Sequence, residues 1–224
     1  MGIDTVANHY NTHLDQEWER LDRHRTEFAV TRKVMEAYLP LPAARVLDLG
    51  SGPGRYAIAL SQSGYSVTLA VAKAQEVGVV FEGILASDAA ALPPEWAERF
   101  DAALVLGPLY HLLDYEERLQ TVHEVHRVLK PGGIVIASFI GRFAPIRDLA
   151  INSPDWIAEH PHRLAQLIQR GQNPAYEGSA FPDSYFALPE EIVPLMEAGG
   201  FATINMVGCE GVVVVCDRKS RLCG

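Results

Sequence analysis

The sequence predicts an α/β protein whose mostly parallel sheet is covered by helices on both faces. Three observations predict this class: short apolar runs alternate with amphipathic segments, a glycine-rich turn follows the first run, and 48% of the 224 residues are hydrophobic. Strands buried on both faces are typically continuous apolar runs, and the helices that cover them carry an apolar stripe. A chain of this length has room for one well-buried core.

The expected elements follow in a regular order. Residues 5–38 are expected to be helical and to end before Pro40 and Pro42, which cannot continue a helix. Parallel strands are expected over 45–49, 66–71, 79–87, 101–106 and 134–140, with helices over 56–63 and 115–129. The second of these helices has an apolar stripe, formed by Leu119, Val122, Val125 and Leu129. A helix over 189–199 and two strands over 203–209 and 212–216, joined by a tight turn, complete the prediction.

Residues 142–189 differ from the rest in being rich in Pro, Asn, His and aromatic residues. One helix is expected there, over 154–170. An insertion after a sheet strand typically forms a lid or a substrate wall, and its aromatic side chains either line an apolar pocket or pack the insertion itself. The predicted organisation is one domain with an N-terminal helical cap (1–42), a core (43–141 and 190–218) and a lid (142–189).

Charge and composition narrow the partners. The net charge of −9 provides no basic field for a phosphate backbone, so a nucleic-acid partner is not expected. The first residues are polar and no apolar run reaches about 18 residues, so we expect a cytoplasmic protein without a membrane segment. Cys209, Cys216 and Cys223 are expected to be reduced thiols. His123 and His126 lack further ligands nearby in sequence, so no metal site is predicted.

The glycine-rich turn DLGSGPG (48–54) follows the first strand. Glycines there permit positive φ and expose bare backbone to a ligand, while the next helix presents free N–H groups. A tight strand-to-helix turn without a ligand would use the same residue types. The spacing is GxGxG rather than the GxGxxG of dinucleotide-binding proteins, which disfavours a nicotinamide-dependent oxidoreductase.

Four motifs in order resemble those of the class I S-adenosylmethionine-dependent methyltransferases, in their small-molecule type. They are the glycine turn, Ser87-Asp88-Ala89 after the third strand, FDAALVLGPLYHL (100–112) and RVLKPGGIVIASF (127–139). The resemblance covers roughly residues 46–218. It implies a Rossmann-like fold with an antiparallel C-terminal strand pair, S-adenosylmethionine as the cofactor and S-adenosylhomocysteine as its product.

The resemblance also implies which residues contact the cofactor. They are Asp48, Gly50, Ser51, Gly52, Gly54, Asp88, Ala89, Leu106 and Gly107. Asp48 would reach the methionine amino group, and Asp88 would accept from the adenine amino group. The residues from Gly50 to Gly54 would line the methionine and the ribose. Either aspartate could instead cap the turn after its strand.

Methyl transfer from a sulfonium is an in-line displacement that depends on aligned reactants, with a base needed only where the acceptor starts protonated. Tyr110 and His111, just past the fourth strand, are the candidate catalytic residues. Tyr110 would form a cofactor wall or touch the acceptor, and His111 would be a general base; packing roles are the alternatives. Tyr185, Arg142 and Tyr10 are further candidates for facing the methyl group.

The second crossover departs from the family pattern. The family's second strand ends in Asp or Glu, which binds the ribose hydroxyls, whereas the matching place here is Ala70 or Val71 and no carboxylate follows before Glu76. Losing such a hydrogen bond costs about 1.5–3 kcal/mol, or roughly ten- to hundredfold in affinity. The predicted linker 72–78 is also short for a crossover that contains a helix. A natural deletion, an engineered one or omitted residues would each produce this spacing.

The sequence therefore predicts methyl transfer from S-adenosylmethionine to a small-molecule acceptor whose pocket is shaped by residues 142–189. The alternative is a non-catalytic methyltransferase-fold protein with weakened cofactor binding, acting as a binding or assembly module. A sheet face left open by the short crossover would expose apolar surface and favour a homo-oligomer.

Overall fold

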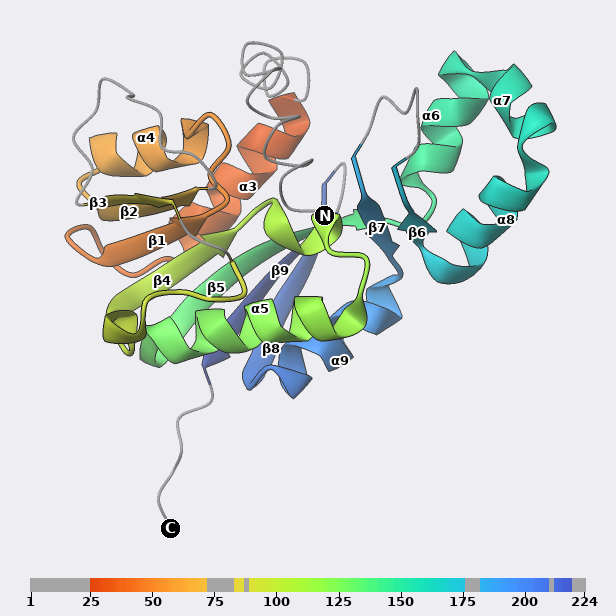
Figure 1. The fold of residues 1–224 in the computed structure, drawn as a ribbon. Helices are drawn as coiled ribbons and strands as arrows, with labels where there is room; N and C mark the ends of the chain where they lie inside the picture. Colours follow the sequence, from red (N-terminus) through yellow and green to blue (C-terminus); the bar gives the residue numbers. More distant parts are fainter. Residues whose placement is uncertain (1–24, 72–82, 87–88, 176–181, 210–211, 219–224) are drawn as a thin grey trace.

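The computed structural model describes residues 25–71, 83–86, 89–175, 182–209 and 212–218. Its centre is a sheet in which five parallel strands run in the order β3-β2-β1-β4-β5 (Figure 1). These strands are β1 (Arg45–Leu49), β2 (Ser66–Val71), β3 (Gly83–Ala86), β4 (Phe100–Val105) and β5 (Leu129–Gly141). Beyond β5, the sheet continues with two antiparallel strands, β9 (Val212–Arg218) and β8 (Phe201–Gly208). The predicted mostly parallel sheet and its antiparallel C-terminal pair are confirmed.

Helices cover both faces of this sheet (Figure 1). One face packs against α3 (Arg25–Tyr38) and α4 (Arg55–Gln62), and the other against α5 (Tyr115–Val128) and α9 (Pro189–Ala198). Adjacent residues of a strand point to opposite faces, and Val46 and Leu47 of β1 are accordingly buried in the two different clusters. A strand buried on both faces cannot alternate with polar residues, which is why RVLDL is nearly all apolar.

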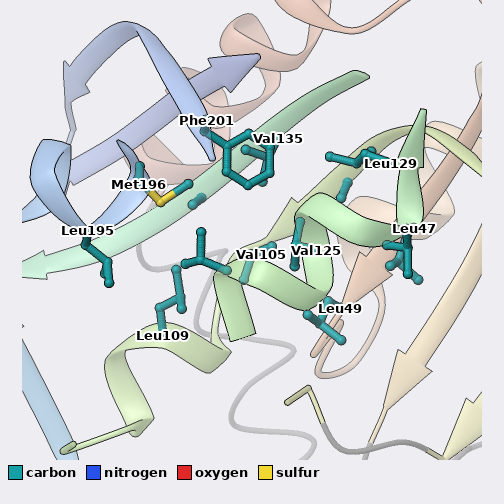
Figure 2. Close-up of a cluster of buried hydrophobic side chains, with 14 of the residues drawn as sticks. Leu47, Leu49, Val105, Leu109, Val125, Leu129, Val135, Leu195, Met196 and Phe201 are labelled. Carbon is teal, nitrogen blue, oxygen red and sulfur yellow. The ribbon is translucent and has the colours of Figure 1, made fainter. Parts of the chain in front are cut away.

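The larger cluster lies between the sheet and α5 with α9 (Figure 2). Leu47, Leu49 and Val105 from the strands meet Val125 of α5 and Met196 of α9 there. Burying such side chains stabilises a fold by roughly 1.5–3 kcal/mol each. The packing fixes the carboxyl ends of β1 and β4 next to each other, and the site is built at those ends.

Two element boundaries differ from the sequence prediction. β3 begins at Gly83 rather than at residue 79, so the linker covers 72–82, which lie outside the described residues. Its parallel pairing with β2, from Thr68↔Gly83 onward, shows that register rather than the apolar run sets where β3 begins. The helix expected over 154–170 is divided into α7 (Pro154–Glu159) and α8 (Pro161–Arg170). His160 has φ −126° and ψ 50°, because a residue before proline avoids the helical region.

The inserted segment begins with α6 (Ala144–Asn152), which was not expected, and α6, α7 and α8 stand beside the sheet (Figure 1). Its stem consists of two short antiparallel strands, β6 (Gln172–Asn173) and β7 (Ser184–Ala187). β7 also pairs in parallel with the last residues of β5, through Ile140↔Phe186 and Gly141↔Ala187. The stem therefore extends the sheet at the carboxyl end of β5. In the described ranges, no helix has both the length and the apolar character needed to span a bilayer.

Candidate functional site

The glycine turn joins the carboxyl end of β1 to α4. Gly50, Gly52 and Gly54 have φ of +73°, +52° and +79°, a region that only glycine occupies readily. A Cβ on Gly50 would lie 2.6 Å from Cγ of Pro108, whereas a Cβ on Gly52 or Gly54 would meet open space. Gly50 is thus needed for a close contact with the loop after β4, and the later glycines leave bare backbone accessible to a ligand.

Asp48 provides a buried carboxylate beside this turn. Its side chain is 2% exposed, and no described residue hydrogen-bonds to it or forms an ion pair with it. Burial raises the pKa of Asp48 to about 7, because the charged form loses its hydration. A buried carboxylate without a partner is costly, and a ligand cation would supply the missing counter-charge.

Ser51 carries a second polar group without a protein partner. Its Oγ is buried and makes no hydrogen bond within the described part of the chain. A hydroxyl in that situation costs free energy unless something else supplies a donor or an acceptor. The carboxylate of Asp48, the hydroxyl of Ser51 and the open glycine backbone together form a set of groups suited to a polar ligand with a cationic part.

The loop after β4 faces the glycine turn. It consists of Leu106, Gly107 and a short 3-10 helix, η2 (Pro108–His111). A Cβ on Gly107 would lie 3.4 Å from the carbonyl oxygen of Gly50 and 3.8 Å from Oη of Tyr110. β1 and β4 are parallel neighbours, so both loops leave the same edge of the sheet. Ligands of α/β proteins bind outside the carboxyl ends of the strands, as here.

The candidate catalytic residues are both in η2. Tyr110 donates its hydroxyl hydrogen to the carbonyl of Leu106 at 3.2 Å, and its ring centroid is 4.8 Å from that of His111. Nδ1 of His111 is 2.9 Å from the carbonyl oxygen of Asp183. A carbonyl only accepts, so Nδ1 carries the proton and, in the neutral imidazole, Nε2 carries the lone pair. This is the tautomer that a base acting through Nε2 requires.

Sequence comparisons identify related proteins of one kind. A methyltransferase-domain family model matches residues 47–137, which include the glycine turn and η2. The ubiquinone biosynthesis O-methyltransferase of Azotobacter vinelandii is 29% identical over 184 residues, covering 78% of this chain and 71% of that protein. A tRNA (carboxymethyluridine(34)-5-O)-methyltransferase of Arabidopsis thaliana is 34% identical over 122 residues, covering 50% of this chain but only 28% of that protein.

Solved structures share the fold. A Burkholderia thailandensis 1,6-didemethyltoxoflavin-N1-methyltransferase, solved with that compound and S-adenosylhomocysteine, superposes with a TM-score of 0.68 at 16% identity, covering 96% of this chain and 88% of that one. A Thermotoga maritima S-adenosylmethionine-dependent methyltransferase, described as a possible histamine N-methyltransferase, gives 0.64 at 20% identity, covering 95% and 99%. The chain belongs to the class I S-adenosylmethionine-dependent methyltransferases.

The cofactor of this methyltransferase is therefore S-adenosylmethionine, and the site's residues fit it. The ammonium of its methionine part matches the unpaired carboxylate of Asp48 in charge, and its polar groups suit the Ser51 hydroxyl. Ala70, at the end of β2, is buried and offers no carboxylate to the ribose, although its carbonyl accepts from Gly50 N at 2.7 Å. Asp88, Glu76, Glu82 and Tyr10 lie outside the described residues, while Ala89 packs against the larger core cluster.

Two further sequence candidates have other partners in the methyltransferase. Arg142 is 2% exposed and donates from Nη2 to both carboxylate oxygens of Glu191, at 2.8 and 2.7 Å. Tyr185 donates its hydroxyl hydrogen to Glu191 Oε2 at 2.6 Å. Burial, followed by that hydrogen bond, raises the pKa of Tyr185 to about 12. Rather than facing a methyl group, both residues hold the stem of the inserted segment to α9.

Arg118 and Glu191 were not singled out from the sequence. Arg118 is buried on α5, on the same side as Val122 and Val125, where the sequence pattern indicated only apolar packing. A cation three and four residues before buried positions was the available signal. Glu191 reads in sequence as a carboxylate in the first turn of a helix. Among the described residues, no group of three or more His, Cys, Asp or Glu could hold a metal ion, and Cys209 is a free thiol.

Proposed function

We propose that this enzyme transfers the methyl group of S-adenosylmethionine to a small organic molecule held between η2 and the inserted segment. The observation that carries the proposal is the contact between Gly50 and Pro108. It brings the turn assigned to the cofactor against the loop that bears Tyr110 and His111. Reactants bound on the two loops would thus be neighbours, which is the main requirement of an in-line displacement.

The acidic chain supports a small acceptor over a nucleic acid. The net charge is −9, whereas proteins that hold a phosphate backbone neutralise it with Lys and Arg. The relatives named for ubiquinone biosynthesis and the toxoflavin-precursor enzyme, by their names, modify small molecules at oxygen or nitrogen. The tRNA-modifying relative is covered over only 28% of its length, so RNA is the competing acceptor to be tested.

The cofactor would supply an electrophilic methyl group on a sulfonium. Asp48 and Ser51 would hold its methionine part, and the open backbone at Gly52 and Gly54 would lie along it. Asp48, protonated near neutral pH when unpaired, would ionise fully beside a bound ammonium. Binding would thereby satisfy the two polar groups that the protein itself leaves without partners.

At the acceptor side, we assign His111 as the general base. The hydrogen bond from Nδ1 to Asp183 orients the ring and leaves Nε2 to take the proton of a hydroxyl or N–H acceptor. Tyr110 stacks beside this ring and would form one wall of the site. The lid, residues 142–189, would form the opposite wall and exclude water.

The test is an acceptor panel with the purified chain at saturating S-adenosylmethionine, read by mass spectrometry. Catechol, histamine, 1,6-didemethyltoxoflavin and a tRNA transcript cover phenol, amine, heterocycle and RNA acceptors. Methylation of a small molecule, with tRNA blank, is the expected result. Methylation of tRNA alone would replace the small-molecule proposal. If all acceptors are blank and S-adenosylhomocysteine fails to bind at millimolar concentration, the chain is the non-catalytic module instead.

A further inference from the structure

A continuous polar network links the loop after β4 to the stem of the inserted segment. We call it the stem network, and it comprises Arg118, Tyr185, Glu191 and Arg142. Arg118, in the first turns of α5, donates from Nη1 to the carbonyls of Leu112 and Leu113, at 2.6 and 3.0 Å. Its guanidinium carbon lies 3.6 Å from the centroid of the Tyr185 ring. Arg118 therefore bridges the end of η2 and strand β7.

The position of Arg118 is energetically costly. The residue is 4% exposed, its Nε has no hydrogen-bond partner, and in the described part of the chain no carboxylate lies within ion-pair distance of it. Burial lowers the pKa of Arg118 below its usual value, with Tyr185, Asp114 and Glu191 opposing the shift from farther away. Two carbonyls and a ring face offset only part of this cost. The contacts that Arg118 does make all fix the relative position of η2 and β7.

The ring beneath Arg118 is itself fixed at its far end. The hydroxyl of Tyr185 donates to Glu191 Oε2, which also accepts from the backbone N–H of Leu188 at 2.8 Å. Arg142 completes the network: besides its bidentate pair with Glu191, it donates from Nη1 to the carbonyls of Ile168 and Gln169, at 3.1 and 3.4 Å. The network thus runs from η2, through β7 and α9, to the last turn of α8.

The same two elements are joined at His111. The carbonyl that accepts from Nδ1 of His111 belongs to Asp183, two residues before Tyr185 at the start of β7. Gln172 of β6 donates from Nε2 to the carbonyl of Leu113 at 3.1 Å. A shift of Tyr185 relative to η2 would therefore move the carbonyl that sets the ring orientation of His111.

We propose that Arg118 is a positioning residue for methyl transfer, which acts through the Leu112 and Leu113 carbonyls and the Tyr185 ring to hold His111 in its Nδ1–H orientation. This inference rests on the proposed function, because it takes His111 as the base. Arg118 does not touch the reactants. Its contribution is the fixed distance between the loop that carries the base and the strand that orients it.

Arg127 offers a matched control on the same helix. It also donates to backbone carbonyls, those of Leu92, Pro93 and Pro94, and pairs with Glu124 at 2.7 Å. It lies near the end of α5, next to the residues that lead into the amino end of β4, and so at the sheet edge opposite η2. Arg127→Leu removes a comparable set of hydrogen bonds without touching the stem network.

The experiment compares Arg118→Leu, Arg118→Lys, Tyr185→Leu, Tyr185→Phe and Arg127→Leu. The first readout is the ring ¹⁵N NMR signal of His111 in enzyme saturated with S-adenosylhomocysteine. Arg118→Leu and Tyr185→Leu should replace the Nδ1–H signature with a tautomer mixture. Tyr185→Phe keeps the ring face, and Arg118→Lys keeps the cation, so both should retain most of the signature. Arg127→Leu should lower the melting temperature and leave the His111 signal unchanged.

The second readout is kinetic, with whichever acceptor of the panel the wild type methylates. Arg118→Leu should lower kcat about ten- to hundredfold, the scale of a small misplacement of a reacting group. Its Kd for S-adenosylhomocysteine should stay within about twofold, because the stem network does not reach the glycine turn. Arg118→Lys should recover part of kcat, a rescue that lost stability alone would not produce.

The proposal is overturned if folded Arg118→Leu keeps the wild-type His111 signal, or if Arg127→Leu changes that signal as much. Where Arg118→Leu does not fold, Tyr185→Leu and Arg118→Lys decide by the same signal. The NMR readout needs no acceptor, so a wild type inactive on the whole panel would end the proposed function while the ring orientation is still measured. Wild-type activity with an unchanged His111 signal in every variant would end only the positioning role.

Discussion

Gly50 of the first turn and Pro108 of η2 are in contact, so close that a Cβ on Gly50 would lie 2.6 Å from Cγ of Pro108. The contact joins loops that are far apart in sequence and come together because β1 and β4 are parallel neighbours. It defines the edge at which the cofactor turn and the candidate base meet.

Gly50→Ala should weaken S-adenosylhomocysteine binding at least tenfold. The added methyl group forces η2 or the glycine turn to shift, and φ of +73° adds roughly 1 kcal/mol of strain for a non-glycine residue. Gly52→Ala is the control, because its φ of +52° carries similar strain while its Cβ would meet open space. Calorimetric titration measures both, and equal losses in the two variants would contradict a role for the Pro108 contact.

Asp48 should make the unliganded enzyme less stable as the pH rises. Its pKa is about 7 in the folded state against an ordinary 3.8, so between these values the folded state holds a proton that the unfolded state has released. Stability therefore falls from about pH 4 to about pH 7 and then levels off, by an amount on the order of 4 kcal/mol. Asp48→Asn should remove this component in urea unfolding at pH 5 to 8.

The same Asp48→Asn variant should bind S-adenosylhomocysteine about ten- to hundredfold more weakly, because the neutral amide cannot pair with the ammonium. A variant that is more stable at pH 8 yet binds less tightly would separate the two effects of one carboxylate. Parallel unfolding profiles for the wild type and Asp48→Asn would show that the carboxylate is partnered in solution.

Val71→Asp should tighten cofactor binding. Val71 ends β2, where the family pattern places the ribose-binding carboxylate and where this chain has none. A restored charge-assisted hydrogen bond is worth about 1.5–3 kcal/mol, or roughly ten- to hundredfold in Kd for S-adenosylhomocysteine. Val71→Asn controls for the change in shape. No gain over Val71→Asn would mean that the ribose is held from elsewhere.

His111→Asn should lower kcat about 100-fold or more for a hydroxyl or N–H acceptor, the range typical of a lost general base. The Kd for S-adenosylhomocysteine should not change, because the glycine turn is untouched. The plot of kcat against pH for the wild type should show one ionisation that is missing in the variant. A variant with normal kcat would reassign His111 to packing.

Glu191→Gln should destabilise the fold by about 3 kcal/mol, because it leaves the buried guanidinium of Arg142 without its counter-charge. Arg142→Met should cost less, since the Glu191 side chain is 37% exposed and regains water. The double variant should cost clearly less than the sum of the two changes, which urea unfolding measures directly. Additive losses would mean that the pair is not coupled.

The order of the elements and the cofactor turn could be predicted from the sequence because both are local properties. An apolar run such as RVLDL has to be buried on both faces, and the glycines of the turn adopt φ values that few other residues could. The departures were local as well: the extended His160 before Pro161 divides a predicted helix, and the pairing register moves the start of β3 to Gly83.

The sequence alone determined the α/β class, the methyltransferase motifs and the residues that present a polar, glycine-rich turn. Only the tertiary structure decided which distant groups meet: Gly50 with Pro108, His111 with Asp183, and Arg142 with Glu191. The physical reason is that such contacts depend on strand order and on the close packing of side chains, neither of which is encoded in any short stretch of chain. Arg118 illustrates the difference, since one position in a helical pattern acquires its role from the ring and the carbonyls that the fold places around it.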